Sequence, residues 1–286
     1  MNAAHLTTRL MIGQGVLFAA ETMIIHHIGS SVPVMELALI RSVSGIILAI
    51  TVARNIGFAV VHTCQLPLQL LRGVASLIYS WVMIYSFGHL TFADATAISY
   101  TQAAYIAVFA VLLLGETVSR SQWYAAALGI LGALLIAKPA FANWNSGYLI
   151  AVFGTSLNGL SFVLNRYLMR GDSEATTMFY ANLVPVLGNV PILWMSGLPS
   201  SDSLLWLPSL FLLGPMGVYL GIVAVKHANA SILGPYTLLR LVIALIGGMM
   251  IFREVPDISS CSGAALILAS CMSSSWIGRK RDAAPS

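Results

Sequence analysis

The chain has 286 residues, of which 58% are hydrophobic and only 8% are charged, and its mean hydropathy is +0.86. Soluble domains carry roughly 25% charged residues, so this composition excludes a soluble globular protein and indicates an integral membrane protein. A net charge of +4 would suggest nucleic-acid binding in a soluble chain, but here we assign the excess cations to membrane topology and expect no nucleic-acid partner.

Ten apolar segments follow one another along the chain. A helix needs about 20 apolar residues to cross a hydrocarbon core of ~30 Å. We expect spans at about residues 10–28, 33–53, 66–88, 94–114, 121–138, 147–166, 175–197, 204–225, 230–251 and 258–277. The first segment lacks a clean cleavage site of small residues, so we interpret it as a retained span rather than a signal peptide. The expected fold class is an all-α polytopic membrane protein.

The lysines and arginines indicate which ends of the spans face the cytoplasm. With the N-terminus placed inside, the cytoplasmic basic residues are Arg9, Arg54, Arg72, Arg120, Arg166, Arg170, Lys226, Arg279, Lys280 and Arg281. Only Lys138 and Arg253 fall outside. This bias follows the positive-inside rule. We therefore expect a multi-pass protein of the bacterial inner membrane with both termini in the cytoplasm, and we expect the basic tail to bind lipid of the inner leaflet.

An internal repeat organises the chain. Residues 93–116 begin with the tetrad ADAT and stop at Glu116, and residues 228–254 begin with the tetrad ANAS and stop at Glu254. Nine residues after each Glu, the sequences AAALGIL and GAALILA follow in the same order. The tetrads introduce spans four and nine, so each half holds five spans and the halves enter the membrane with opposite orientation. We expect two inverted five-helix repeats, at 1–143 and 144–286.

These features resemble the EamA-type repeats of the drug/metabolite transporter superfamily. The resemblance rests on the paired tetrads, on the exits Gly115-Glu116 and Arg253-Glu254, and on the small-residue helices that follow them. The chain as a whole is most similar to bacterial aromatic amino-acid exporters of that superfamily. The resemblance implies a central substrate cavity surrounded by spans one to four and six to nine, with spans five and ten at the periphery. Arg253 stands where the family usually has a glycine.

Glu21 and Arg41 are ionisable residues inside predicted spans, where such residues need a partner or water. Glu21 lies seven residues before the outer end of the first span, and Arg41 lies about eight residues after the outer start of the second. A helical hairpin brings them to nearly the same depth, so we expect them to pair. Two interpretations stay open: an ion pair that locks the hairpin, or a proton-sensitive switch in a transport cycle.

Arg240 has no nearby acid in its own span and lies four residues after Tyr236, so both share one helix face. Gly234 and Pro235 come just before, and proline removes a backbone donor and loosens the helix. Irregular backbone at this depth is tolerated where protein or a water-filled cavity receives it. Arg240 is therefore a candidate to bind a substrate carboxylate. The alternative is an arginine that snorkels or bonds freed carbonyls.

Further polar and aromatic residues fall on spans three, four, six and eight. Aligning the tetrads places Thr101 opposite Tyr236 and Tyr105 opposite Arg240. A mostly apolar site with few polar groups suits an amphipathic organic solute rather than a bare ion. The candidate substrate-binding residues are Tyr79, Tyr100, Thr101, Gln102, Tyr105, Asn158, Phe162, Tyr219, Tyr236 and Arg240. Any single tyrosine can instead be a packed residue, so the hypothesis depends on their convergence.

Enzymatic and metal-binding functions find little support in the residues. His89 and Asp94 match the His-x4-Asp pattern of lipid acyltransferases, but they lie at an outer helix junction and overlap the first tetrad. The scattered cysteines Cys64, Cys261 and Cys271 indicate neither a disulfide framework nor a metal site. We expect no enzyme activity, cofactor or metal. A membrane-embedded acyltransferase and a non-transporting signalling protein remain as alternatives from other classes.

The residues and the resemblance together predict a secondary transporter that works by alternating access through a central cavity. The resemblance implies export of amino acids with aromatic or large apolar side chains, and a broader drug or metabolite exporter is the alternative. The expected partners are a small-molecule solute and membrane lipid, with the protein a monomer or weak dimer. The sequence leaves open whether export is coupled to protons or runs downhill.

Overall fold

The computed structural model describes residues 3–28, 34–53, 60–90, 92–139, 146–196, 201–252 and 257–282. Within these ranges the chain is helical and contains no strand. Eight of the predicted spans are continuous helices, namely α1 (Ala3–Ile28), α2 (Val34–Val52), α3 (Leu66–His89), α6 (Arg120–Ala137), α7 (Ser146–Leu168), α8 (Glu174–Ser196), α9 (Ser201–His227) and α12 (Ile258–Asp282). The fourth and ninth spans are interrupted. The protein is thus an all-α polytopic membrane protein.

Two helices extend beyond the predicted boundaries. Helix α1 begins at Ala3 rather than near residue 10, and α12 continues to Asp282 rather than ending near residue 277. Hydropathy marks only the part of a helix that suits the membrane, whereas backbone hydrogen bonding continues into the polar flanks. The predicted boundaries were therefore too short at these two ends.

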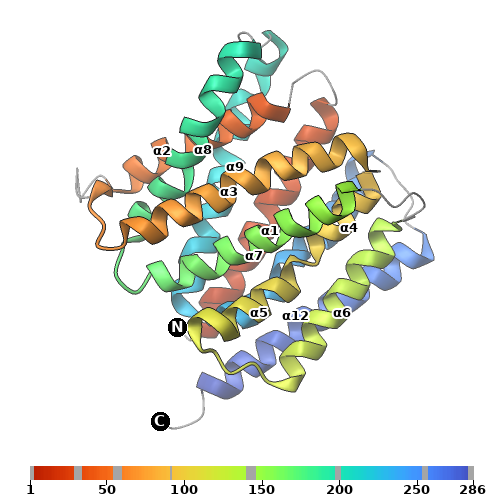
Figure 1. Ribbon diagram of the computed structural model, residues 1–286. Coiled ribbons are helices and arrows are strands. Elements are labelled where there is room, and N and C mark those ends of the chain that lie inside the picture. Colours follow the sequence, from red (N-terminus) through yellow and green to blue (C-terminus); the bar gives the residue numbers. More distant parts are fainter. Residues whose placement is uncertain are drawn as a thin grey trace.

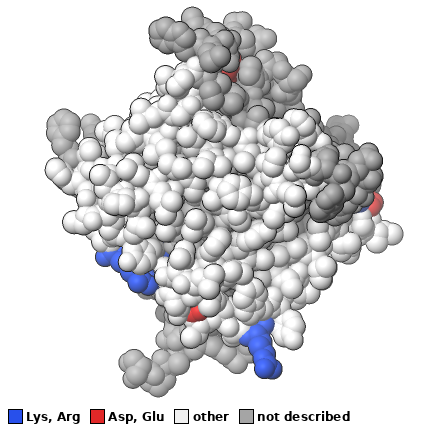
Figure 2. Space-filling model, in the orientation of Figure 1, with Lys and Arg blue, Asp and Glu red and all other residues white. Residues whose placement is uncertain are grey.

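The helices present an apolar surface to lipid. Among the described residues, five helical stretches are long and apolar enough by themselves to cross a membrane, namely 6–25, 66–83, 97–114, 146–168 and 230–250. Large apolar side chains such as Leu112, Leu149 and Met272 are exposed on the outside. Figure 2 shows a wide middle zone without Lys, Arg, Asp or Glu in the described part of that face, with the charged residues at its margins. A hydrocarbon environment requires such a zone.

The helices pack as two related halves. Helix α1 packs against α9 as α7 packs against α3, and α1 packs against α11 as α7 packs against α5. Helix α2 contacts α9 as α8 contacts α3. The contact pairs α2–α8 and α6–α12 each map onto themselves when the two halves are exchanged. Exchanging the halves therefore maps these contacts onto one another, which is the arrangement of two repeats around a pseudo-two-fold axis. Figure 1 shows α6 and α12 together at one edge of the molecule.

The fourth span differs from the continuous helix that we predicted over 94–114. It consists of α4 (Phe92–Tyr100) and α5 (Gln102–Leu114), with Thr101 in a turn between them. The Thr101 hydroxyl donates a hydrogen bond to the carbonyl of Ile98 at 2.6 Å. A threonine that bonds back to its own helix in this way bends the helix and competes with the regular ladder.

The ninth span is interrupted at the related place. It consists of α10 (Ala230–Leu233), a 3-10 turn η4 (Gly234–Leu238), α11 (Leu239–Gly247) and a wide π-type turn η5 (Gly248–Phe252). The Thr237 hydroxyl donates to the carbonyl of Gly234 at 2.7 Å, which parallels the bond made by Thr101. Pro235 opens η4 and lacks the backbone donor that a continuous helix needs. Both halves therefore carry a broken helix in the same position.

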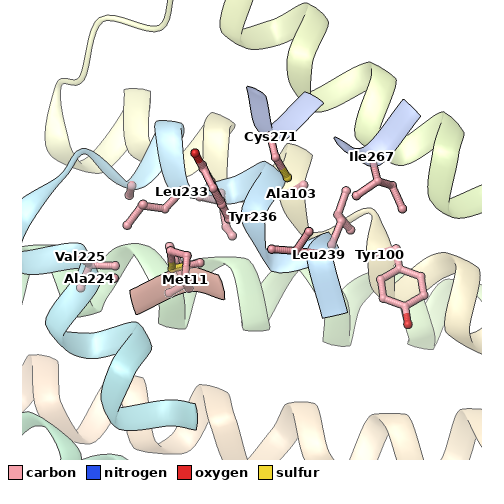
Figure 3. Packing of buried hydrophobic residues seen from close by; sticks show 14 of the residues in the cluster. Met11, Tyr100, Ala103, Ala224, Val225, Leu233, Tyr236, Leu239, Ile267 and Cys271 are labelled. Atoms are coloured by element: carbon pink, nitrogen blue, oxygen red, sulfur yellow. The ribbon is translucent and has the colours of Figure 1, made fainter. Parts of the chain in front are cut away.

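A buried apolar cluster joins the two halves around these breaks. Met11 of α1, Ile106 of α5, Leu233 of α10 and Ile267 of α12 are fully buried in it. Figure 3 shows this cluster with Tyr100 at its edge and the Tyr100 hydroxyl pointing away from the other labelled residues. The apolar cluster therefore fixes the broken spans while leaving polar ends of side chains at its border.

Candidate functional site

Four side chains from four helices converge between the two halves, and we call them the central polar group. Tyr79 of α3 and Tyr100 of α4 belong to the first half, and Asn158 of α7 and Arg240 of α11 belong to the second. The Arg240 Cζ atom lies 5.3 Å from the centroid of the Tyr100 ring, which is a cation–π contact. The Tyr100 hydroxyl also interacts with this guanidinium, and the Tyr79 hydroxyl interacts with the Asn158 side chain.

The helix breaks position this group. Tyr100 is the last residue of α4, immediately before the turn at Thr101. Arg240 is the second residue of α11, directly after η4. Discontinuous helices in transporters place backbone and side-chain polar groups near the middle of the membrane, where a solute can meet them. The sequence thus builds one polar centre from two broken spans.

Arg240 carries a charge that the described residues do not balance by a salt bridge. The three salt bridges formed among them involve Arg41, Lys138 and Lys226. Arg240 is only partly buried, and its guanidinium lies against the aromatic ring of Tyr100. A cation at membrane depth without a carboxylate is costly, so this position favours an anionic ligand.

Glu21 and Arg41 form an ion pair, with Arg41 Nη1 at 3.7 Å from Glu21 Oε1. The Glu21 side chain is 7% exposed and that of Arg41 is 42% exposed. The Arg41 Cζ atom also lies 5.2 Å from the centroid of the Phe18 ring. A β-carbon at Gly214 of α9 would overlap Glu21 Oε1 and would lie 3.1 Å from Arg41 Nε. The pair therefore lies between an aromatic ring and bare backbone.

Several other candidate residues are buried or partly buried in helix contacts around the broken spans. Phe162 and Tyr236 are 9% and 5% exposed and belong to the apolar cluster. Gln102 is buried on α5. Tyr105 lies where α5 crosses α7, since a β-carbon at Gly159 would be 2.7 Å from the Tyr105 Cβ atom. These residues shape the walls around the broken spans.

Tyr219 lies elsewhere on α9. It packs against a cluster that contains Met178 and Ile222, and it is within electrostatic range of Glu174 and Lys226. Those two residues form a salt bridge at the end of the helices that we expect to face the cytoplasm. Tyr219 therefore lies on α9 between Gly214 and this inner end.

Phe18 and Gly214 contact the ion pair, but no pattern in the sequence identified either of them as a site residue. Phe18 lies three residues before Glu21 on α1, so both share a face of that helix. Gly214, Gly217 and Gly221 have the i, i+3, i+7 spacing of a small-residue packing face. That spacing does not say what the face packs against. The structure shows that Gly217 abuts the Phe18 ring.

Both tetrads are held by residues of the opposite half. The Tyr148 hydroxyl of α7 donates to Asp94 Oδ2 of the first tetrad at 2.7 Å. The Glu116 carboxylate accepts hydrogen bonds from the backbone of Ala230 and Ser231 in the second tetrad. Each contact lies at the end of an interrupted span and crosses between the halves. The related exit at 253–254 and the junction at 141–145 lie outside the described residues.

Both residues of the acyltransferase pattern contact tyrosines in the structure. The His89 ring stacks on the Tyr85 ring with centroids 3.9 Å apart, and its Nδ1 atom lies 2.9 Å from the Tyr85 carbonyl oxygen. Asp94 is engaged by Tyr148. In the part of the chain that the structure describes, no cluster of three or more His, Cys, Asp or Glu side chains could hold a metal ion.

Comparison with known proteins decides the family. The sequence model of the EamA-like transporter family matches residues 8–138 and 145–276, once in each half. The chain belongs to this family. This EamA-like transporter is 25% identical over 262 residues to the pseudopaline exporter of Pseudomonas aeruginosa, across 89% of this chain and 90% of the relative. It is 26% identical over 259 residues to the S-adenosylmethionine uptake transporter of Rickettsia conorii, across 87% and 85% of the two chains.

A solved crystal structure shares the fold of this transporter. It superposes with a TM-score of 0.81 over 97% of this chain and 99% of the other, at 16% sequence identity. At that identity the likeness establishes the fold alone. The expected membership of the drug/metabolite transporter superfamily is confirmed, and both named relatives are transporters rather than enzymes. Neither relative is an aromatic amino-acid exporter, so the comparisons establish a small-molecule transporter and not its substrate.

Proposed function

We propose that this protein is a secondary transporter of the bacterial inner membrane that exports amino acids with aromatic or large apolar side chains by alternating access. The observation that carries the proposal is Arg240, a guanidinium against the Tyr100 ring with no salt-bridge partner among the described residues. A substrate carboxylate supplies the missing negative charge and accepts charge-assisted hydrogen bonds from Arg240. Tyr79 and Asn158, from opposite halves, then flank the same ligand.

The aromatic surroundings support an apolar substrate side chain. The Tyr100 ring lies against Arg240 and belongs to the buried apolar cluster, and Tyr79 is within electrostatic range of Arg240. Sites with many apolar groups and few polar ones bind organic solutes that carry one charged end. Aromatic rings also stack on flat side chains at a favourable free energy of about 0.5–1.5 kcal/mol. An amino acid such as phenylalanine or methionine fits this chemistry.

The pseudo-symmetric packing supports alternating access. Two related bundles can exchange their arrangements, which opens a site between them first to one side and then to the other. Contacts between the halves occur at both ends of the broken spans, at Asp94 with Tyr148 and at Glu116 with Ser231. We infer that one of these contacts opens while the other holds. With both termini in the cytoplasm, the Glu116 contact belongs to the inner end.

The relatives favour a second candidate, a broader metabolite transporter. One relative is named for the export of pseudopaline and the other for the uptake of S-adenosylmethionine. S-adenosylmethionine contains a methionine unit, so it shares with our proposed substrates an amino-acid end. The two names differ in direction, and export is therefore part of the proposal.

Reconstituted vesicles test the proposal. Purified protein in lipid vesicles should transport labelled phenylalanine and methionine but not a bulky quaternary drug cation, because such a cation has no carboxylate for Arg240. Repeating the measurement with and without a pH gradient shows whether protons drive the flux. Flux of the drug cation without flux of either amino acid would instead support the broader exporter. Acyl transfer that depends on His89 would contradict any transporter assignment.

A further inference from the structure

The Glu21–Arg41 pair has the composition of a binding site for an organic cation. Glu21 supplies a carboxylate that is nearly inaccessible, with 7% of its side chain exposed. The Phe18 ring faces the guanidinium of Arg41, whose Cζ atom lies 5.2 Å from the ring centroid. A buried carboxylate beside an aromatic ring is the combination that binds ammonium-type groups.

Arg41, which occupies this site, pairs only weakly with Glu21. The 3.7 Å between Arg41 Nη1 and Glu21 Oε1 exceeds the roughly 2.7–2.9 Å of a charge-assisted hydrogen bond. The Arg41 side chain is 42% exposed, whereas the Glu21 side chain is 7% exposed. Removing Arg41 from this position therefore costs less than removing Glu21. A competing cation that makes a closer contact with Glu21 replaces Arg41 without leaving the carboxylate unpaired.

The pseudo-symmetry makes this site the counterpart of the Tyr79–Asn158 contact in the central polar group. Glu21 and Asn158 each lie 13 residues after the start of a family match, at residues 8 and 145. Tyr79 and Gly214 each lie 14 residues before their tetrads. Tyr79 of the first half faces Asn158 of the second, and Gly214 of the second half abuts Glu21 of the first, so the same two positions meet twice across the boundary between the halves.

The symmetry is broken at these positions, and charged side chains fill the place of the missing tyrosine. Where the first half has the tyrosine side chain of residue 79, the second half has only the backbone of Gly214. The Arg41 guanidinium lies against that backbone, with Nε 3.1 Å from the place of a β-carbon. Tyr79 is within electrostatic range of both Arg41 and Arg240, so the two arginines belong to the surroundings of one tyrosine.

We propose that Glu21 is the subsite for the cationic group of the substrate, and that Arg41 occupies this subsite until the substrate displaces it. For an amino acid the cationic group is the α-ammonium, which takes over the pairing with Glu21 as Arg41 moves away. This inference rests on the proposed function, because it takes the substrate to be a zwitterion whose carboxylate binds Arg240. Glu21 and Arg240 then bind the two charged groups attached to the α-carbon of one molecule.

Binding of two half-substrates to the purified full-length protein tests the subsite without requiring transport. 2-Phenylethylamine has the ammonium and no carboxylate, and 3-phenylpropionate has the carboxylate and no ammonium. Glu21→Gln should weaken binding of the amine by about tenfold or more, because a hydrogen bond between charged groups is lost. The same variant should leave binding of 3-phenylpropionate unchanged. Ser42→Ala is the control, since the Ser42 hydroxyl donates to the carbonyl of Ala38 on its own helix.

Arg41→Met separates the subsite from a structural lock. Because the substitution removes the competing guanidinium, it should tighten binding of 2-phenylethylamine several-fold, and this result does not depend on the Glu21 variant folding. Amine affinity that is unchanged in Glu21→Gln, or that falls in Arg41→Met, would overturn the subsite. Amine binding that depends on Glu21, in a protein whose vesicles transport no amino acid, would leave the subsite standing and remove the proposed function alone.

Discussion

Glu116 binds Ser231 across the boundary between the two halves. Its Oε2 atom accepts a hydrogen bond from the Ser231 hydroxyl at 2.7 Å and from the Ser231 backbone amide at 3.2 Å. Its Oε1 atom accepts from the Ala230 amide at 3.1 Å. Gly115 ends α5 in the left-handed conformation, with φ at 64°, and so turns the chain toward this contact. The contact fixes the start of the broken span that carries Arg240.

Breaking this contact should release the inner end of the ninth span. Glu116→Ala removes three hydrogen bonds to a charged acceptor, and we expect it to lower the free energy of unfolding by about 1–3 kcal/mol. Cys271 reports the opening, because it is buried and its thiol lies 3.5 Å from the Pro235 carbonyl of η4. With the exposed Cys64 and Cys261 replaced by serine, thiol labelling should be faster in Glu116→Ala than in the parent. Equal labelling rates would contradict the role of Glu116 at this end.

Alanine should destabilise the protein more at Gly132, where α6 crosses α12, than at Gly115, which ends α5. A β-carbon at Gly132 would lie 2.5 Å from the Gly263 carbonyl oxygen, and one at Gly263 would lie 2.5 Å from that of Gly132. Backbone cannot move aside as a flexible side chain can, so Gly132→Ala should destabilise the protein by about 1–3 kcal/mol. Gly115→Ala meets no atom within 4 Å and should cost only about 1 kcal/mol, from its left-handed backbone. Thermal unfolding in detergent measures both.

The salt bridge between Glu174 and Lys226 predicts a pH dependence of stability. Burial raises the pKa of Glu174, but the hydrogen bond and charge of Lys226, together with a backbone hydrogen bond and the charge of His227, lower the pKa below its ordinary value. A lowered folded-state pKa means that the pair stabilises the protein above about pH 4.3 and loses this effect as the pH falls through the folded value. The difference in Tm between the parent and Lys226→Met should therefore be constant from about pH 5 to 8 and should shrink below about pH 4. For a partly exposed pair we expect at most about 1 kcal/mol.

Periodicity, charge and repeat spacing were enough to predict the architecture. Charge-free lengths gave ten spans, and the matching tetrads gave two halves whose helix contacts exchange as a symmetric pair requires. The depth of Glu21 and Arg41 along a hairpin was sufficient to place them together. These features follow from lengths along a helix, which the sequence determines directly.

Details that depend on local competition could not be predicted. Pro235 indicated the break in span nine, but no proline or glycine marks the break at Thr101, where a hydroxyl competes with the helix ladder. Tyr236 and Phe162 are aromatic residues on spans that line the centre, and their burial in the apolar cluster depends on how the helices rotate. The role of Gly214 next to the ion pair depends on which side chains occupy the place that its own side chain would fill, and these come from other helices.

The ring beneath Arg240 should matter more than its hydroxyl. Tyr100→Leu removes the cation–π contact, which is worth about 0.5–2 kcal/mol, and should raise the KM for phenylalanine about 2- to 30-fold. Tyr100→Phe keeps the ring and loses only the hydroxyl, so its KM should rise less. A Tyr100→Phe defect as large as that of Tyr100→Leu would assign the role to the hydroxyl instead. Initial rates of transport in vesicles give both values.

The KM of Arg240→Gln in vesicles tests the central claim most directly, which is that Arg240 binds the substrate carboxylate. Loss of a charged pairing should raise the KM for phenylalanine at least about tenfold, while phenylalaninamide, which has no carboxylate, should be affected little by the same change. Arg240→Lys should recover part of the affinity, because it restores the charge without the planar fork. A KM for phenylalanine that is the same in Arg240→Gln and in the parent protein would contradict this account.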